Sequence, residues 1–295
     1  MSTTRAAIAP MLSRPMAYVT LAKPDVTFLV VMTTALGYAI GVRGPVDYLA
    51  LARVVLGTTL VAAGTSALNQ YVERDADAVM RRTAHRPLPL GILPPSEALA
   101  FGVSLLLAGA LFLLLAVNAL ACLLGVISCA AYLGFYTPLK SRTPWATFVG
   151  AFPGAVPPLI GWAAARGSLD RGAWILFAIL FIWQFPHFLA IAWMYREDYA
   201  RAGIRMLPVV EPSGVSTFRQ IVGYAAVLVP VSLLPAVVGL AGVRYFFCAI
   251  ILNLALLQVC LWASREKTNQ RAKWLMHATV IHLPILLALM IFDKL

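Results

Sequence analysis

Three oxygen-bearing side chains are evenly spaced in the first third of the chain. Asn69, Glu73 and Asp77 occupy positions i, i+4 and i+8, so on a helix they form one stripe about 12 Å long. Carboxylates in one stripe repel each other, and the arrangement is costly unless cations lie against it. Oxygen ligands of this kind suit Mg²⁺, which binds one or two carboxylates together with substrate phosphate oxygens. The spacing predicts a magnesium site, from which Asp75 points away.

Arginines follow this stripe closely. Arg82 and Arg86 come next in the chain, and the planar guanidinium group matches the geometry of phosphate. A divalent cation and arginines together indicate a diphosphate site. The alternative is a solvated loop in which acids and bases only pair with each other. Because the stripe begins at Asn69, inside an apolar run, and polar groups at membrane depth are candidates for function, the site is favoured.

A second group of acids and bases follows another apolar run. Glu197 and Asp198 precede Arg201, and we expect this acidic helix end to hold the other side of the same magnesium diphosphate. Asp198 is the first candidate ligand and Glu197 the second. The alternative is a set of solvated pairs within one helix. Between the two groups, Lys140 and Arg142 are either further phosphate ligands or ordinary determinants of membrane topology.

The elements that must position these residues are membrane-spanning helices. Apolar residues make up 61% of the sequence and charged residues 12%, about half the charge of an ordinary soluble domain. Runs of about 20 apolar residues are long enough to cross a bilayer as helices. We expect an all-α polytopic helix bundle in one domain, residues 1–295, with residues 1–22 as an N-terminal cytoplasmic segment and no removable signal peptide. The expected helices are nine: 24–42, 48–72, 97–117, 119–137, 145–165, 173–195, 219–240, 244–263 and 274–292.

The basic residues behind the net charge of +11 lie mainly in the connections on one side of the membrane and do not form a single patch. The N-terminal segment and the connections after the second, fourth, sixth and eighth helices hold 17 of the 23 Lys and Arg residues. The positive-inside rule therefore places the N-terminus and both acidic groups in the cytoplasm and the C-terminus outside. This pattern argues against nucleic acid as a partner. The expected location is the cytoplasmic (inner) membrane of a bacterium.

Several motifs in the chain resemble the intramembrane prenyltransferase superfamily. The stripe from Asn69 to Asp77, with Arg82-Thr83 and Arg86-Pro87-Leu88, is similar to its first aspartate-rich motif. Two further blocks of the chain resemble the haem-farnesylating branch, the protohaem IX farnesyltransferases. They are Trp183-Gln184-x-Pro186-His187-Phe188, and Asp198-Tyr199-x2-Ala202-Gly203 with Met206-Leu207-Pro208. The chain departs from the superfamily where Glu73 replaces an aspartate and where Met194 stands four residues before Asp198.

The resemblance implies a transferase that moves the farnesyl group of farnesyl diphosphate to a vinyl group of haem b. It implies Mg²⁺ as cofactor, haem b as substrate, an apolar cavity for the prenyl chain, membrane lipid around the bundle, and a downstream haem-modifying or oxidase-assembly protein as partner. The implied metal ligands, which are also the catalytic residues, are Asn69, Glu73, Asp77 and Asp198, with Glu197 as a further ligand. The implied substrate-binding residues are Arg82, Arg86, Lys140, Arg142, Tyr136, Trp183, Gln184, His187 and Arg201.

Some roles remain open at this point. Tyr132, Tyr136, Trp145 and Trp183 are candidates to shelter an allylic cation, or they are interfacial aromatic residues. His187 either faces haem or is a buried, hydrogen-bonded histidine. Two other functions compete with haem farnesylation: prenylation of a quinone-precursor ring, which the block from Trp183 to Phe188 disfavours, and anion transport, which needs polar residues through the whole bundle.

Overall fold

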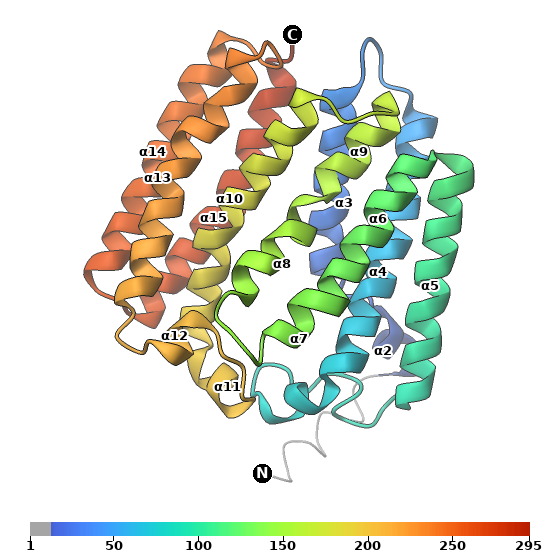
Figure 1. Ribbon diagram of the computed structural model, residues 1–295, viewed down its shortest axis with the longest axis vertical. Helices are drawn as coiled ribbons and strands as arrows, with labels where there is room; N and C mark the ends of the chain where they lie inside the picture. Colours follow the sequence, from blue (N-terminus) through green and yellow to red (C-terminus); the bar gives the residue numbers. More distant parts are fainter. Residues whose placement is uncertain (1–12) are drawn as a thin grey trace.

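The computed structural model describes residues 13–295. Within this range, nine helical stretches are long and apolar enough to span a membrane, and they form one bundle (Figure 1). The predicted all-α membrane fold is confirmed. The spanning elements are α3 (Pro24–Gly41), α4 (Tyr48–Val79), α5 (Pro95–Ala116), α6 (Ala119–Ala131) with its continuation to Leu139, α8 (Ala146–Ala155) with α9 (Pro157–Arg166), α10 (Arg171–Met194), α13 (Val215–Val237), α14 (Val243–Arg265) and α15 (Asn269–Phe292).

Most boundaries lie within a few residues of the expected ones, but α4 is longer. It runs for 32 residues and ends at Val79, whereas the apolar pattern predicted an end at residue 72. Asp47 caps its first turn, since its carboxylate accepts from the backbone N–H groups of Leu49 and Ala50. The extension carries Glu73 and Asp77 on the same continuous helix as Asn69.

Two of the spanning stretches are interrupted. α6 passes into a π-helix, Tyr132–Tyr136, and then into the short α7 (Thr137–Leu139). α8 and α9 meet at Val156, because the two prolines that follow have no N–H to continue the helical ladder. Ser128 of α6 replaces the donor missing at Pro157, since its Oγ donates to the Pro153 carbonyl at 3.1 Å. Gln184 of α10 adds a bond to the end of α8, from its Nε2 to the Ala151 carbonyl at 3.1 Å.

Three short helices that the sequence did not predict lie at the end of the bundle opposite the C-terminus: α2 (Arg14–Leu21), α11 (Arg196–Arg201) and α12 (Leu207–Val210) (Figure 1). α2 buries Ala17 and Leu21 against α4 and α5. Arg14 also pairs with Glu97 of α5 at 2.7 Å. Of the expected N-terminal segment 1–22, residues 1–12 lie outside the described range.

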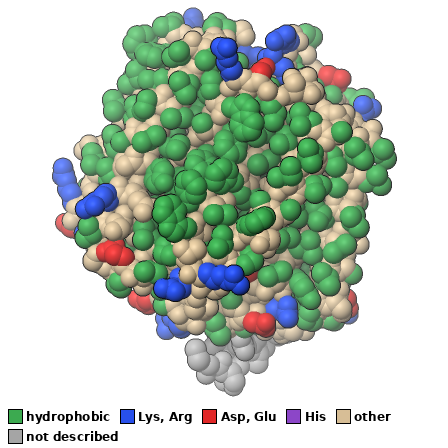
Figure 2. Space-filling view, in the orientation of Figure 1, with side chains coloured by type: hydrophobic (Ala, Val, Ile, Leu, Met, Phe, Trp, Pro, Cys, Tyr) green, Lys and Arg blue, Asp and Glu red, His purple; other side chains and the backbone are tan. Residues whose placement is uncertain are grey.

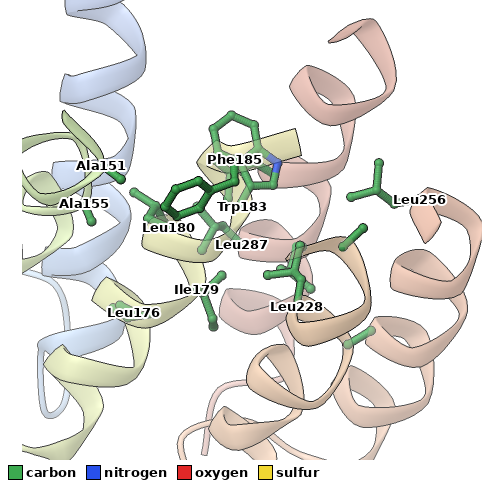
Figure 3. Close-up of a cluster of buried hydrophobic side chains, with 14 of the residues drawn as sticks. Ala151, Ala155, Leu176, Ile179, Leu180, Trp183, Phe185, Leu228, Leu256 and Leu287 are labelled. Atoms are coloured by element: carbon green, nitrogen blue, oxygen red, sulfur yellow. The ribbon is translucent and has the colours of Figure 1, made fainter. Parts of the chain in front are cut away.

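The core is centred on α10, which packs against α8, α13 and α15. Figure 3 shows Leu180 and Trp183 of α10 meeting Leu287 of α15, with Leu228 of α13 on the other side. The outer surface is apolar as well. Figure 2 shows apolar side chains over the middle of one face, with Lys and Arg gathered toward its two ends, which is the distribution expected of a bundle surrounded by lipid.

Candidate active site

The predicted stripe lies along the last turns of α4. Asn69 and Asp77 are both 1% exposed, and Glu73 lies half-buried between them. The Asp75 carboxylate points to solvent, with 89% of its side chain exposed. Thr83 Oγ1 donates to the Asp77 carbonyl at 3.0 Å and so satisfies one of the last carbonyls of the helix. The helical register assumed from the spacing is therefore the one the chain adopts.

Each polar group of the stripe is paired with a cation from a different segment. Lys23 Nζ, from the corner before α3, donates to Asn69 Oδ1 at 2.9 Å. Lys140 Nζ donates to Glu73 Oε1 at 2.7 Å. In the third pair, Arg86 Nη1 donates to Asp77 Oδ2 at 2.6 Å. Three cations and two carboxylates thus meet at one end of the bundle.

Lys23 was not identified from the sequence as a site residue. A lysine before a helix-starting proline has no spacing that marks it, and its place depends on the corner between α2 and α3. Its φ of 46° makes it the one non-glycine residue with positive φ in the described range, a conformation that costs about 1–3 kcal/mol and often occurs at functional sites. Gln70 holds this corner, because its Nε2 donates to the carbonyls of Thr20 and Leu21 at 3.1 and 3.0 Å.

Burial and mutual repulsion act on these cations. Burial, together with the positive charge of Arg86, lowers the pKa of Lys23 to about 7. Burial also opposes the charge of Lys140, but the neighbouring Tyr136, Tyr132 and Glu73 outweigh it and hold the pKa of Lys140 well above its usual value. The Lys140 ammonium lies 4.4 Å from the centre of the Tyr136 ring. An added anion would relieve the repulsion among the cations.

Asp198 joins the second acidic group to the first. Its carboxylate accepts from the backbone N–H groups of Arg81 and Arg82 at 3.3 and 3.1 Å, forms an ion pair with Arg201, and is 7% exposed. The turn after α4 is thereby fixed to α11. A third connection is attached as well, because the Arg205 N–H donates to the Lys140 carbonyl at 2.7 Å.

The π-helix brings aromatic rings to the same end. Tyr132 and Tyr136 lie 5.1 Å apart between ring centres. The helix after them is linked to the stripe, since Asn69 Nδ2 donates to Thr137 Oγ1 at 3.4 Å. π-helical turns often occur at functional sites. Tyr136, the last residue of this turn, lies four residues before Lys140, and its ring lies beside the Lys140 ammonium.

The block from Trp183 to His187 is partly structural. Trp183 Nε1 donates to the Thr279 carbonyl at 3.0 Å. Both Gln184 amide donors are engaged, with Ala151 and with Leu180 at 3.1 Å each, and the residue is 4% exposed. Gln184 thereby ties α10 to α8 near the break, and its predicted role in substrate binding remains a prediction. His187 is half-buried and stacks on Trp183, with ring centres 5.1 Å apart.

Four other predicted residues lie at the edges of the site. The guanidinium of Arg82 lies 5.0 Å above the Tyr195 ring, and its Nε is buried without a hydrogen-bond partner. Arg142, Trp145 and Glu197 are exposed to solvent. Their predicted contacts with phosphate, cation and metal remain predictions.

The donor set suits a magnesium ion that shares its shell with phosphate. Among the described residues, no three His, Cys, Asp or Glu side chains are close enough to form a metal centre alone. Mg²⁺ needs no such cage, since one or two carboxylates with substrate phosphates and water complete its shell. Asp77 Oδ1 is buried without a partner, although buried carboxylate oxygens normally have one. An oxygen of this kind, one helical turn from Glu73, fits a metal ligand.

The chain matches known proteins over nearly its whole length. The family model described as "UbiA prenyltransferase family" matches residues 30–282. A protoheme IX farnesyltransferase of Solibacter usitatus is 50% identical over 286 residues, covering 94% of this chain and 98% of the relative. Enzymes of the same name from Salinibacter ruber and Aquifex aeolicus are 44% and 38% identical. Each alignment covers 94% of this chain, and 98% and 94% of the respective relatives.

Solved structures share the fold. A structure of digeranylgeranylglyceryl phosphate synthase has a TM-score of 0.78 at 20% identity, covering 94% of this chain and 97% of that one. A UbiA homologue from Archaeoglobus fulgidus, bound to DMAPP and Mg²⁺, has a TM-score of 0.67 at 14% identity, covering 92% of this chain and 98% of that one.

Proposed function

This chain belongs to the UbiA prenyltransferase family, and from that premise we propose that it transfers the farnesyl group of farnesyl diphosphate to a vinyl group of haem b, giving haem O and diphosphate. The relatives named protoheme IX farnesyltransferase support this acceptor, because they are 37–50% identical over most of the chain. One observation carries the proposal: Lys23, Arg86 and Lys140 converge on the stripe of Asn69, Glu73 and Asp77.

This arrangement is chemically complementary to a magnesium diphosphate. The Archaeoglobus fulgidus homologue, which shares the fold, is bound to DMAPP and Mg²⁺. In this chain, Asn69, Glu73 and Asp77, with Asp198 at the adjoining turn, would hold magnesium. Bound there, Mg²⁺ would supply positive charge to the leaving diphosphate. Lys140 and Arg86 now pair with carboxylates and are placed to exchange those partners for phosphate oxygens.

The protein residues favour departure of the diphosphate. The bond between farnesyl C1 and the diphosphate oxygen breaks, its electron pair leaves with the oxygen, and negative charge grows on the diphosphate. Lys23, Arg86 and Lys140 stabilise that charge in a site of low dielectric, where preorganised donors are most effective. Arg82, whose Nε is buried without a partner, adds a further donor.

The allylic cation that remains needs shelter from water. Tyr132 and Tyr136 present two rings beside the cluster, and each aromatic face contributes about 0.5–2 kcal/mol to a nearby cation. The vinyl carbon of haem b then bonds to farnesyl C1. Water adds to the resulting cation next to the porphyrin ring and releases a proton, which leaves the hydroxyl group of haem O.

The acceptor binds beside α10 and α15 in this proposal. His187 is the half-buried member of the block from Trp183 to Phe188 that remains available to a ligand, while Trp183 and Gln184 support it from within the core. The alternative acceptor, a quinone-precursor ring, contains no iron and needs no iron ligand. A role for His187 in binding the acceptor is therefore expected for haem b and not for the ring.

Anion transport is disfavoured by the distribution of acids and bases. In the described part of the chain, the buried acids are Asp77 and Asp198, and the two lie at the same end of the bundle. The other buried polar residues of the described range are Thr, Ser, Asn, Gln and His, such as Ser232 and Asn253, and none is Asp, Glu, Lys or Arg. A path for an anion would need basic groups that continue across the bundle.

The cellular setting follows from the same argument. The protein lies in the cytoplasmic membrane of a bacterium with the diphosphate site on the cytoplasmic side and the C-terminus outside, as the charge distribution predicts. Its product, haem O, passes to a haem-modifying enzyme or to an oxidase-assembly protein.

Release of diphosphate tests this function. Purified protein receives farnesyl diphosphate and Mg²⁺ together with haem b, with a phenolic quinone-precursor acid, or with no acceptor. Of the three conditions, only the one that contains haem b is expected to release diphosphate. This release should disappear when a chelator is added and return with excess Mg²⁺. Release that depends on the phenolic acid would establish the alternative acceptor, and undiminished release in chelator would refute the metal site.

A further inference from the structure

Thr279 of α15 is a fully buried residue on which three hydrogen bonds converge. Its exposed fraction is 0%. Its hydroxyl donates to the Met276 carbonyl at 2.6 Å, and its carbonyl accepts from Trp183 Nε1 at 3.0 Å. The third bond joins Thr279 Oγ1 to His187 Nδ1 at 2.8 Å. A single residue of α15 thus holds both the tryptophan and the histidine of α10.

The hydrogen bonds of Thr279 favour one tautomer of His187. A threonine hydroxyl has one proton, and the 2.6 Å contact places that proton on the bond to the Met276 carbonyl. With the proton there, Thr279 Oγ1 accepts from His187, and Nδ1 carries the ring proton. The Nε2 atom of a neutral ring then bears the free lone pair.

The imidazole is also held in place. It stacks on Trp183 with an interplanar angle of 15°, and Phe188 packs edge-on against it at 5.4 Å between ring centres. Trp183 is itself tied to the Thr279 carbonyl. Within the described part of the chain, Nε2 has no hydrogen-bond partner, and His187 is only half-buried. A histidine that donates through one nitrogen and offers the other has the arrangement of a metal ligand with its supporting residue.

We propose that Thr279 is a positioning residue that fixes His187 in the Nδ1–H tautomer and so presents Nε2 to the iron of the haem substrate. The proposal rests on the proposed function, since it takes haem b as the acceptor. A core histidine that needed only one hydrogen bond would not require its stacking partner to be tied to the same residue. Thr279 contacts no substrate, and it acts through His187.

Spectroscopy separates this role from a purely structural one. Purified protein is titrated with ferric haem b, and the Soret band and the dissociation constant are measured for the wild type, Thr279→Val, Thr279→Ser and His187→Ala. Valine keeps the shape of threonine but cannot accept the bond, so haem affinity should fall about 10–100-fold, as for other supporting residues of metal ligands. Serine keeps the hydroxyl and should bind haem as the wild type does. His187→Ala should lose the wild-type Soret position and regain it with added imidazole.

His282 provides a matched control. It lies three residues after Thr279 on α15, is 3% exposed, and neither of its ring nitrogens has a hydrogen-bond partner. His282→Ala should leave the Soret band unchanged. A changed band in His282→Ala with a wild-type band in His187→Ala would overturn the proposal, and so would equal haem affinity in Thr279→Val and Thr279→Ser.

Failure of the proposed function has a different signature. If wild-type protein binds no haem b and releases no diphosphate in its presence, the acceptor itself is wrong. If wild-type protein farnesylates haem b while Thr279→Val and Thr279→Ser show the same Soret band and affinity, only the positioning role is wrong. Thermal unfolding and farnesyl diphosphate binding should match the wild type in Thr279→Ser, which confirms that the comparison is made on folded protein.

Discussion

Asp77 is the residue at which the energetic argument for the site is strongest. One carboxylate oxygen bonds Arg86 at 2.6 Å, and the other is buried without a partner. Leaving a buried polar group unsatisfied costs about 1–3 kcal/mol, so a fold that retains it sacrifices stability at this position. An unsatisfied buried oxygen is expected where a bound ligand supplies the missing partner. Asp75, two residues away, is exposed to solvent and pays no such penalty.

Replacing Asp77 by Asn should reduce turnover by at least about 100-fold, by analogy with the loss of one preorganised electrostatic group. The side chain keeps its shape, but one negative charge of the metal site is lost. Turnover of purified protein with farnesyl diphosphate and haem b is the measurement. Asp75→Asn is the control and should stay within a few fold of the wild type. Equal losses in the two variants would show that the stripe does not carry the chemistry.

The stripe could be predicted from the sequence because helical spacing places Asn69, Glu73 and Asp77 on one face. Lys23 and Thr279 could not. A lysine before a proline and a threonine within an apolar helix are ordinary in sequence, and their partners, Asn69 and His187, lie 46 and 92 residues away along the chain. Their roles depend on tertiary contacts that no local pattern records.

At the scale of elements, the sequence predicted the membrane-spanning helices, whose existence depends on composition. It did not predict the interruptions within them, which depend on packing against other helices. Long apolar runs are sufficient to predict nine spanning helices. The break between α8 and α9 is supported by side chains of other helices, Ser128 and Gln184, which donate to carbonyls of α8. The helices α2 and α11 are short and half-polar, so a search for apolar runs does not detect them.

The contact between α3 and α9 depends on two glycines. A Cβ at Gly37 would clash with the Pro158 carbonyl, and a Cβ at Gly161 would clash with the Thr34 carbonyl. Small residues at such crossings let helix backbones approach closely within a membrane. The crossing joins the helix that follows Lys23 to the broken span that α10 supports, so it bears on the geometry of the site.

Gly37→Ala and Gly161→Ala should each destabilise the protein, because the helix backbones must move apart. A penalty of about 1–3 kcal/mol is typical of overpacking, and it should appear as a lower midpoint of thermal unfolding in detergent. Gly223→Ala in α13 is the control, since a Cβ there meets no atom within 4 Å. Unchanged midpoints in the α3 and α9 variants would contradict the close crossing.

At the scale of the whole molecule, the fold gathers its chemistry at one end. The turn after α4, the connection through Lys140 and the segment from α11 to α12 are joined by hydrogen bonds at the end where α2 lies. The C-terminus lies at the opposite end (Figure 1), where Lys294 donates to the carbonyls of Ala39 and Val42 at the end of α3.

The charge distribution predicts that the C-terminus faces away from the cytoplasm. Alkaline phosphatase, which folds only outside the cytoplasm, should be active when fused after Leu295 in a bacterial host. The same reporter placed at 266–268, between α14 and α15, should be inactive, because the charge distribution predicts that this connection is cytoplasmic. The reverse pattern of activity would place the diphosphate site on the outer side.

The most direct test of the whole account is the mass of the haem product. Purified protein is incubated with haem b, farnesyl diphosphate and Mg²⁺ in water enriched in ¹⁸O, and the extracted haem is analysed by mass spectrometry. The account predicts a haem heavier than haem b by one farnesyl group and one hydroxyl group, with ¹⁸O in the hydroxyl, and no such product from Asp77→Asn. Unmodified haem b after farnesyl diphosphate has been consumed would contradict it.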